Sequence, residues 1–432
     1  MKRKIFYIVL AALVTFNLVV GARFLISSAT ADPDEAGYGN LTVFTRALQL
    51  IRQDYVDAGK ISYRELTYSA LRGMLASLDP HSQLMEPADF RNMQDETRSE
   101  FGGLGIIVSS RQGVITVISP LEDSPGFRAG VLPGDQILRI NGITTEKMSL
   151  QDAINLLKGD PGKKVTLTIY RSSNKETRDY SLEREIIHVP SVKDSKILDP
   201  DQTGDFKIGY VRITQFNEPT AQDLDQKLNE LQAKGMQALV LDLRFNPGGL
   251  LTSAVDVCGM FLPPGTMVVY TQGRDAVQKR EYRTDRHART HPNFPLVLLV
   301  NGGSASGSEI VAGALKDLNR AILVGETTFG KGSVQSVIQL PDGSALRLTT
   351  ARYFTPGKEI INGNGVTPNI HASLSVEQER ALLLRRRDGV LNPDEQKVVA
   401  EQKDSQLDRA VDALKGIMIY RQNDKSQSSA RE

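Results

Sequence analysis

The sequence predicts a multi-domain α/β protein built around a parallel sheet. The chain has 432 residues, too many for one ordinary domain. Between residues 207 and 325, apolar runs such as ALVLDLR and FPLVLLVN alternate with helix-forming segments. Apolar strands with helices between them are typical of a parallel sheet with helical crossovers. Helical patterns at both ends of the chain complete the expected architecture.

The first 31 residues have the pattern of an export signal. Lys2, Arg3 and Lys4 precede an apolar run over residues 5–20, and residues 29–31 (Ala-Thr-Ala) fit a cleavage site. The run has 16 residues, fewer than the roughly 20 that span a bilayer. A cleaved signal peptide is therefore favoured, and an uncleaved N-terminal membrane anchor is the alternative. Either one places the rest of the chain in the periplasm or cell envelope.

The periodicity changes four times along the rest of the chain. Apolar residues at helical spacing predict a helical region over residues 35–100. Short strands and turns predict a compact domain over residues 101–186. Strand–helix alternation predicts a core over residues 187–370, with a hairpin that turns at Asp342-Gly343. Residues 371–432 predict further helices and a disordered tail, QNDKSQSSARE.

Composition and isolated motifs exclude several kinds of function. The formal net charge is +1, so no nucleic-acid partner is expected. Cys258 is the only cysteine, and a buried structural thiol is expected there. His287 and His291 lack the glutamate of a zinc-binding HExxH helix, so a solvated loop is expected and no metal site. The triple arginine at 385–387 is expected to be a solvated helix face.

The segment GETTFGKGSVQ, residues 325–335, is close to a phosphate-binding P-loop but departs from it. Gly332 stands where a P-loop needs serine or threonine for magnesium. A P-loop also opens a helix whose N-terminus binds phosphate, whereas the residues after Lys331 predict a strand. No nucleotide and no other cofactor is therefore expected, and Lys331 has a different role.

A serine cluster upstream indicates where this lysine acts. Ser304, Ser306 and Ser308 lie in a small-residue turn between a predicted strand and a helix. That helix and the next strand each cover about 16 Å in opposite directions. Ser306 and Lys331 are therefore expected at the same carboxyl edge of the sheet, where open α/β sheets place their sites. A helix cap is the alternative role for Ser306 or Ser308.

A serine, a lysine and backbone N–H donors at one edge predict an acyl-transfer site. Lysine can take the serine proton if burial lowers its pKa from about 10.4. The glycine turn at 246–249 ends at the same edge. An oxyanion can be bound there by the N–H of Gly307 and that of Gly248 or Gly249. No histidine follows an expected core strand, and no GxSxG sequence is present.

The segments SASGSEIVAGAL, VGETTFGKGSVQ and DLRFNPGGLL resemble the C-terminal processing peptidases, also called tail-specific serine proteases. The resemblance extends from about Tyr55 to about residue 370. It implies that Ser306 is the nucleophile, Lys331 the general base, and Gln335 the residue that orients the lysine amine. It also assigns the oxyanion donors to Gly307 and the glycines of the NPGG turn. Many relatives have alanine where this chain has Gly307, and the backbone donor is the same.

The same resemblance implies a PDZ domain over residues 101–186, inserted beside a crotonase-like or ClpP-like protease core. It implies that the loop of Gly103, Leu104, Gly105 and Ile106 captures the C-terminal carboxylate of a peptide. An ordinary hairpin turn is the alternative role for this loop. In relatives the PDZ domain also gates the active site. Arg171 is a candidate for that coupling, although a solvated arginine is the favoured interpretation.

The expected function is that of an exported serine endopeptidase which binds C-terminal tails through its PDZ domain and cleaves them. Its expected partners are proteins or peptides with exposed C-terminal tails, and its helical ends favour a homodimer. Acyl-CoA chemistry is an alternative suggested by the crotonase-like core, but an exported protein meets little CoA. A catalytically silent PDZ peptide-binding module is a second alternative. The presence of Ser306, Lys331 and Gln335 together argues against it.

Overall fold

The computed structural model describes residues 33–429, except 112, 122, 173, 276–278, 287–289, 292–293 and 388–390. The chain divides into two compact units, residues 1–84 and residues 85–432. The predicted signal or anchor segment lies outside the described residues. No helix within the described range combines the length and the apolar character that crossing a membrane requires.

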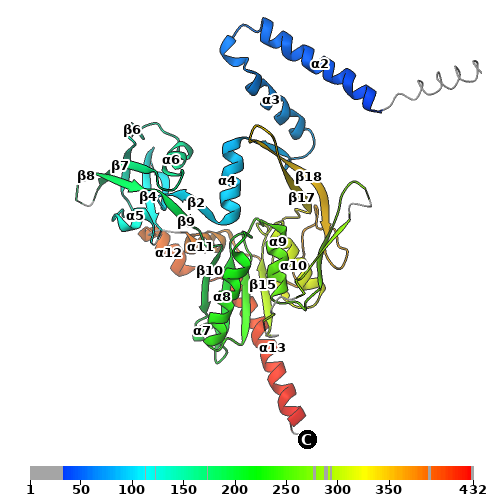
Figure 1. Ribbon diagram of the computed structural model, residues 1–432. Helices are drawn as coiled ribbons and strands as arrows, with labels where there is room; N and C mark the ends of the chain where they lie inside the picture. The colour runs from blue at the N-terminus through cyan, green and yellow to red at the C-terminus, as the bar shows by residue number, and fades with distance from the viewer. Residues whose placement is uncertain are drawn as a thin grey trace, which may run out of the picture. The chain divides into compact units, whose positions relative to one another are not determined.

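The first unit is mostly helical where it is described (Figure 1). It contains α2 (Pro33–Asp54), the 3-10 helix η1 (Ala58–Lys60) and α3 (Tyr63–Ala76). Ser62 caps α3 by accepting a hydrogen bond from the N–H of Glu65. The short strand β1 (Gln83–Met85) lies at the end of this unit, and α4 (Pro87–Arg98) begins the next.

The region from residue 100 to 188 is an antiparallel β structure, as its strand-and-turn texture predicts. Its main sheet has the order β3 (Ile106–Arg111), β4 (Val114–Pro120), β5 (Gln136–Ile140), β7 (Lys164–Arg171) and β8 (Glu176–Glu183), with β6 (Ile143–Thr144) paired to β5. Two helices, α5 (Pro125–Arg128) and α6 (Leu150–Leu157), accompany it. Val165, Leu167 and Ile169 alternate along β7 and are buried in the core of this region. β2 (Glu100–Gly103) and β9 (Glu185–His188) pair as an antiparallel ribbon, through which the chain enters and leaves this region.

A second sheet forms the centre of the larger unit. Its order is β10 (Val192–Ile197), β11 (Ile208–Ile213), β12 (Ala238–Asp242), β15 (Leu296–Val300), β16 (Ile322–Gly325) and β19 (Ile370–His371). The strands from β11 to β19 pair in parallel, and β10 is antiparallel. β12 and β15 are buried along their whole length, because helices cover both faces of the sheet. The predicted parallel sheet is therefore confirmed.

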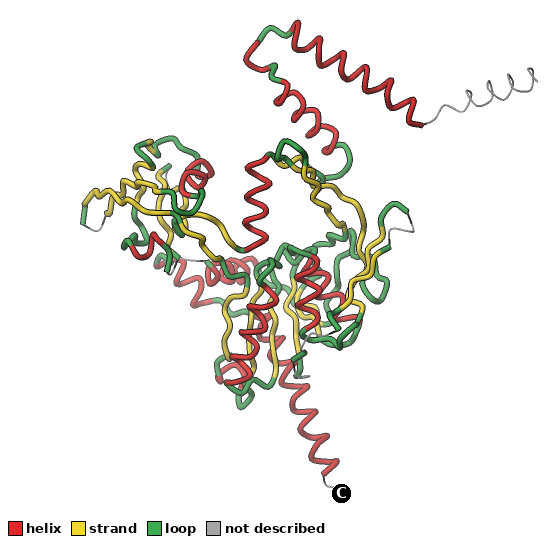
Figure 2. Tube along the Cα trace, in the orientation of Figure 1, coloured by secondary structure: helices red, strands yellow, loops and turns green. Residues whose placement is uncertain are grey.

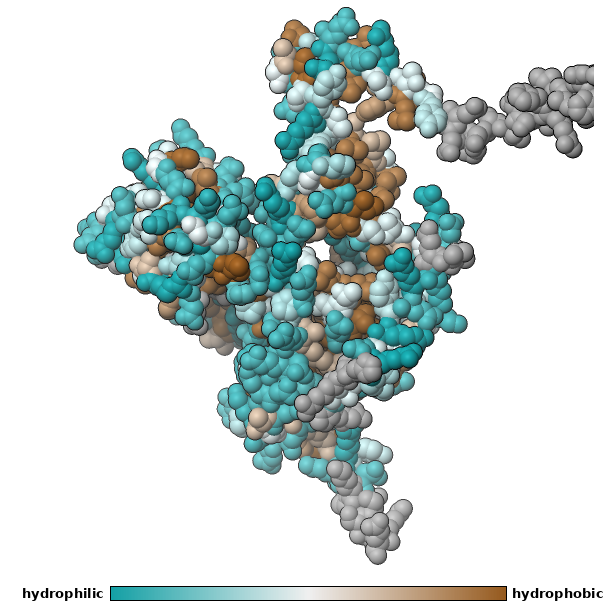
Figure 3. Space-filling view, viewed as in Figure 1, coloured by the Kyte–Doolittle hydropathy of each residue, from teal (hydrophilic) through white to brown (hydrophobic). Residues whose placement is uncertain are grey.

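Alternate residues of these strands pack against different helices. Leu239, Leu241 and Leu298 share one cluster with the crossover helices α8 (Thr220–Ala233), α9 (Leu251–Gly259) and α10 (Gly307–Asp317). Val240 and Leu299 face a second cluster with the C-terminal helix α13 (Ser405–Ser429). The outer face of α8 is hydrophilic (Figure 3). Cys258 is buried in α9, as expected, and burial raises the pKa of its thiol.

A third sheet lies beside the central one and contains the residues that follow Lys331. Apart from β1, its strands are ordered β17 (Ser333–Gln339), β18 (Ala345–Phe354), β13 (Met267–Gln272) and β14 (Arg280–Arg283). Gln339 pairs with Ala345, which confirms the hairpin predicted at Asp342-Gly343. Figure 2 shows this long hairpin. The chain after Lys331 is thus a strand, and the sequence argument against a P-loop holds.

The C-terminal region corrects two expectations. It consists of α11 (Val376–Arg386), α12 (Pro393–Glu401) and α13. The earlier short helix α7 (Pro200–Thr203) contacts α13. The tail expected to be disordered continues α13 as far as Ser429. Glutamine and lysine are good helix formers, and extending an existing helix avoids the cost of nucleation.

Within the triple arginine, Arg385 and Arg387 are exposed, as expected, whereas Arg386 is not. The guanidinium of Arg386 binds the carboxylate of Asp242 at the end of β12, and Arg385 donates to the carbonyl of Val399 at 2.8 Å. Arg387 pairs with Glu395 at 2.6 Å. Each arginine thus has a partner in the fold, and Arg386 ties α11 to the central sheet.

Candidate active site

Ser306 lies in a strained turn at the carboxyl end of β15. Its φ and ψ are 54° and −111°, a conformation that is rare for a residue with a side chain and that clusters at functional sites. Ser304 and Ser308 donate their hydroxyls to the buried carbonyls of Leu243 at 2.8 Å and Asn246 at 2.9 Å. These two serines therefore fix the turn that presents Ser306 at the start of α10.

The carboxylate of Glu309 joins this turn to the lysine loop. Its Oε2 accepts the N–H of Ser306 and the N–H of Lys331, both at 2.8 Å. Its Oε1 accepts the N–H of Gly330 and the hydroxyl of Thr328, both at 2.6 Å. Burial raises the pKa of this fully buried carboxyl, and the four donors oppose the rise. Four donors and no acceptor around it require an ionised carboxylate.

Lys331 is half-buried in the loop between β16 and β17. Burial lowers the pKa of its amine, the charge of Arg347 lowers it further, and Glu309 opposes both. The direction is the one expected for a lysine that acts as a base. Within the described part of the chain, no atom accepts a hydrogen bond from Lys331 Nζ. Ser306 and Lys331 are thus brought to one edge through Glu309, without a direct bond between their side chains.

Gln335 lies on β17, four residues after the lysine. Its Nε2 donates to Ser333 Oγ at 2.8 Å and to Thr349 Oγ1 at 3.3 Å. The structure therefore places Gln335 next to the site but does not pair it with Lys331.

The glycine turn lies directly beside Ser306. A Cβ on Gly248 would be 2.6 Å from the Cβ of Ser306, so a larger residue has no room. The N–H of Gly248 donates to Asn246 Oδ1 at 2.9 Å. The N–H groups of Gly249 and Gly307 donate to no acceptor in the described part of the chain. Of the three expected oxyanion donors, these two are available to a ligand.

The loop expected to bind a carboxylate, residues 103–106, is held tightly within the antiparallel β structure of residues 100–188. Gly105 has φ +64°, and a Cβ there would meet Ser124 at 2.2 Å. The carbonyl of Leu104 accepts the N–H of Gly126 at 2.9 Å, and Leu104 itself is buried. Gly103 ends β2 and Ile106 begins β3. The N–H groups of Leu104 and Gly105 donate to no described acceptor.

Arg171 differs from its expected solvated state. It binds the buried carboxylate of Asp135 at 2.7 Å and the carbonyl of Gly130 at 2.8 Å. The hydrogen bond to Asp135 raises the pKa of the guanidinium. Arg171 therefore forms an ion pair within the antiparallel β structure of residues 100–188.

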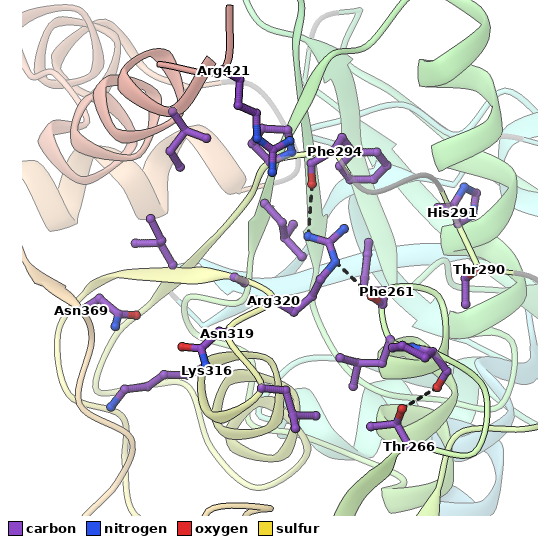
Figure 4. A pocket seen from close by; sticks show the side chains of 18 of the residues that line it. Phe261, Thr266, Thr290, His291, Phe294, Lys316, Asn319, Arg320, Asn369 and Arg421 are labelled. Carbon is purple, nitrogen blue, oxygen red and sulfur yellow. Dashed lines mark hydrogen bonds between the residues drawn. The ribbon is translucent and has the colours of Figure 1, made fainter. Parts of the chain in front are cut away.

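A cavity of about 930 Å³ lies at the opposite, amino ends of β15 and β16 (Figure 4). None of the expected catalytic residues lines it. Arg320 crosses it and donates to the carbonyls of Phe261 and Phe294. His291, expected in a solvated loop, lines the cavity and uses both ring nitrogens, on Asp225 and Gln232. His287 lies outside the described residues.

Sequence reasoning missed Glu309 as a site residue. The pattern Ser306-Gly-Ser-Glu309 is the serine-x-x-glutamate of a helix capping box, and that signal could have identified it. The bonds of Glu309 to Gly330 and Lys331 depend on how α10 and the later loop pack together, so no short sequence pattern indicates them.

Comparison with known proteins identifies the family of this chain. The sequence profile of peptidase family S41 matches residues 207–372, and that of a PDZ domain matches residues 116–171. A carboxy-terminal-processing protease of Bartonella bacilliformis is 40% identical over 86% of this chain and 82% of its own. This chain belongs to the carboxy-terminal processing proteases of peptidase family S41. The protease is thus a serine-type endopeptidase with a PDZ domain, as the sequence analysis expected.

Two further proteins are similar to this chain. Carboxy-terminal processing protease CtpA of Bacillus subtilis is 33% identical to the protease over 87% of this chain and 78% of its own. The solved photosystem II D1 C-terminal processing protease is 31% identical, covers 77% of this chain and 92% of its own, and has a TM-score of 0.43.

We predict that Glu309→Gln slows peptide hydrolysis about tenfold to 100-fold and lowers stability by about 2 kcal/mol. Glutamine keeps the shape of the side chain but presents an NH₂ group to N–H donors and removes the charge. Hydrolysis rates and the midpoint of thermal unfolding measure both effects. Glu326→Gln, in the loop after β16, is the matched control and should change neither. A Glu309→Gln enzyme as fast as the wild type would show that the two loops do not need this carboxylate.

Proposed function

We propose that the protease cleaves peptide bonds with a dyad of Ser306 and Lys331. The observation that carries this proposal is the carboxylate of Glu309, which accepts the backbone N–H of both residues at 2.8 Å. Because it binds both backbones, Glu309 keeps the nucleophile and the base at one edge of the sheet. The lowered pKa of Lys331 supports a neutral amine that can accept a proton.

The reaction follows from these groups. Neutral Lys331 takes the proton of Ser306 Oγ as that oxygen attacks the peptide carbonyl carbon. The N–H groups of Gly307 and Gly249 hold the oxyanion that forms. The lysine ammonium then gives its proton to the leaving amine, and the C–N bond breaks. Lys331 next deprotonates a water molecule, which attacks the acyl ester, and Ser306 recovers its proton as the ester bond breaks.

Gln335 completes this arrangement. We assign it to the orientation of the lysine amine when substrate is bound. Its position on β17, beside the loop that carries Lys331, supports the assignment, since its present partners are the hydroxyls of Ser333 and Thr349. Both bonds are donated by Nε2, so Oε1 is the atom that can accept a hydrogen bond from the lysine amine.

The substrates proposed are exported proteins with exposed C-terminal tails. The free N–H groups of Leu104 and Gly105 beside β3 support capture of a terminal carboxylate by the PDZ domain. The basic and apolar start of the sequence supports export, by a cleaved signal or with an N-terminal anchor. The parallel core with helices on both faces supports a crotonase-like or ClpP-like architecture. Exposed Leu41 and Val43 on α2 support a homodimer.

Two measurements on the wild-type chain test this function. A fluorophosphonate, which reacts with activated serine hydroxyls, should modify Ser306, and the modified peptide is identified by mass spectrometry. A substrate protein with a free C-terminal carboxylate should be cleaved faster than the same protein with an amidated C-terminus. Binding of tail peptides without cleavage or labelling would establish the silent PDZ module instead. A label on another serine would refute the dyad.

A further inference from the structure

The hydroxyl of Tyr353 is buried beside Ser306, and it lacks a hydrogen bond of normal geometry among the described residues. Tyr353 lies on β18 with 2% of its surface exposed. Its Oη finds no described partner in hydrogen-bond geometry. The polar groups that act on it are the carboxylate of Glu309 and the hydroxyl of Ser306. Burial and Glu309 raise the pKa of this phenol, and the contact with Ser306 opposes the rise.

Backbone contacts hold the phenol in this place. The N–H of Tyr353 donates to the carbonyl of Gly332 at 2.9 Å, one residue after the lysine. The Tyr353 ring belongs to the same core cluster as Ile310 and Val311, in the first turns of α10. The side chain therefore reaches from the third sheet to the helix start that carries Ser306.

Stability alone does not explain this hydroxyl. A buried polar group without a partner costs about 1–3 kcal/mol, and each such group in a native fold needs an explanation. Phenylalanine would fill the same space without the cost. The orphan oxygen lies beside the atom that is expected to react, and buried, unsatisfied groups of this kind are typical of sites completed during catalysis.

We propose that Tyr353 is an additional residue of the peptide-cleaving site, whose hydroxyl donates a hydrogen bond to Ser306 Oγ while the serine proton moves to Lys331. Burial and the charge of Glu309 both favour the protonated phenol, so it acts as a fixed donor. As the serine loses its proton, negative charge develops on Oγ, and a donor becomes stronger toward a charged acceptor. The bond therefore favours the reacting state over the resting one. It also fixes the rotamer of Ser306 toward the lysine.

The test is Tyr353→Phe in the full chain, which removes the hydroxyl alone. We expect kcat to fall about tenfold to 100-fold, as for loss of a single donor to a developing negative charge. KM should stay the same, because the bond forms only in the reacting state. The rate of fluorophosphonate labelling of Ser306 should fall by a similar factor. The midpoint of thermal unfolding should be unchanged or higher, since an unsatisfied group has been removed.

Two control variants separate the possible outcomes. Tyr282→Phe, on β14 against the same core cluster, removes a phenolic hydroxyl elsewhere and should leave kcat unchanged. Because the role of Tyr353 rests on the proposed function, Ser306→Ala is measured alongside. Wild-type kcat in Tyr353→Phe with an inactive Ser306→Ala would overturn the role of Tyr353 and leave the dyad intact. A fall in kcat matched by a lower unfolding midpoint would show a structural role and also overturn it. An active Ser306→Ala would refute the dyad itself.

Discussion

Replacing Ser306 or Lys331 by alanine should each lower kcat for peptide cleavage on the order of 10⁴-fold or more. Without Ser306 Oγ no acyl-enzyme forms, and without the Lys331 amine no group at this edge takes the serine proton. The remaining rate would come from the oxyanion donors and from substrate binding. Initial rates on a tailed substrate protein, with active enzyme counted by titration, provide the measurement.

The two effects should not add, because the residues act as a unit. The double variant should be no slower than either single one. Ser336→Ala and Lys358→Ala remove an exposed hydroxyl on β17 and an exposed amine after β18. They are the matched controls and should cleave at the wild-type rate. Additive losses in the double variant would mean that serine and lysine serve separate steps.

If Lys331 is the base, the pH dependence of kcat should report its protonation. Burial and the nearby charge of Arg347 lower the pKa of this amine, and only the neutral amine accepts a proton. The rate should therefore rise with pH as the lysine loses its proton. Arg347→Gln removes the positive charge, so the pKa of Lys331 should go up and the rise in rate should move to higher pH. An unmoved profile would show that another group controls the rate.

The sequence is sufficient to predict the edge of the sheet at which the site forms. Strand and helix lengths between Ser306 and Lys331 return the chain to its starting edge, and this depends on local periodicity alone. The strand after the lysine is likewise visible in its β-branched residues. These features are local, so short-range physical rules predict them.

Partners that pack from distant segments are not predictable in this way. Arg386 lies in a sequence typical of a solvated helix face. Its side chain nevertheless binds Asp242, which precedes it by more than a hundred residues. The pair of Arg171 with Asp135 and the bond from Lys331 N–H to Glu309 likewise join residues that are far apart in the sequence. Side-chain partners across the fold depend on packing that no short segment determines. The wrong expectations for charged residues all have this cause.

Asp242→Asn should lower the free energy of unfolding by about 3–5 kcal/mol, the cost of leaving buried charges without their partner. Asp242 and Arg244 are fully buried, and they pair at 2.7 Å. Asp404 and Arg386 complete a cluster with two charges of each sign. The hydroxyl of Tyr210 donates to Asp242 at 2.7 Å. The variant would leave two arginines facing one carboxylate in the interior.

The dependence of stability on pH follows from the same cluster. Burial by itself would raise the pKa of Asp242, but Arg244 and Arg386 hold it at about 2, below its ordinary value near 3.8. Its ionised form therefore stabilises the fold fully above about pH 4, and the contribution is lost as the pH falls toward 2. Chemical denaturation at a series of pH values measures this. Asp194→Asn, which breaks the more exposed pair with Arg212, is the control and should cost at most about 1 kcal/mol.

Loss of this ionic cluster should also lower the catalytic rate. Arg244 is followed directly by the turn that carries Gly248 and Gly249, and its guanidinium binds Asp404, before α13, at 2.8 Å. The C-terminal helices and the glycine turn at 246–249 are thus connected through one ionic cluster. In Asp242→Asn, kcat should fall at temperatures where the chain is still folded, while binding of tail peptides to the PDZ domain stays unchanged. If kcat keeps its wild-type value up to the unfolding transition, the cluster stabilises the fold without positioning the oxyanion turn.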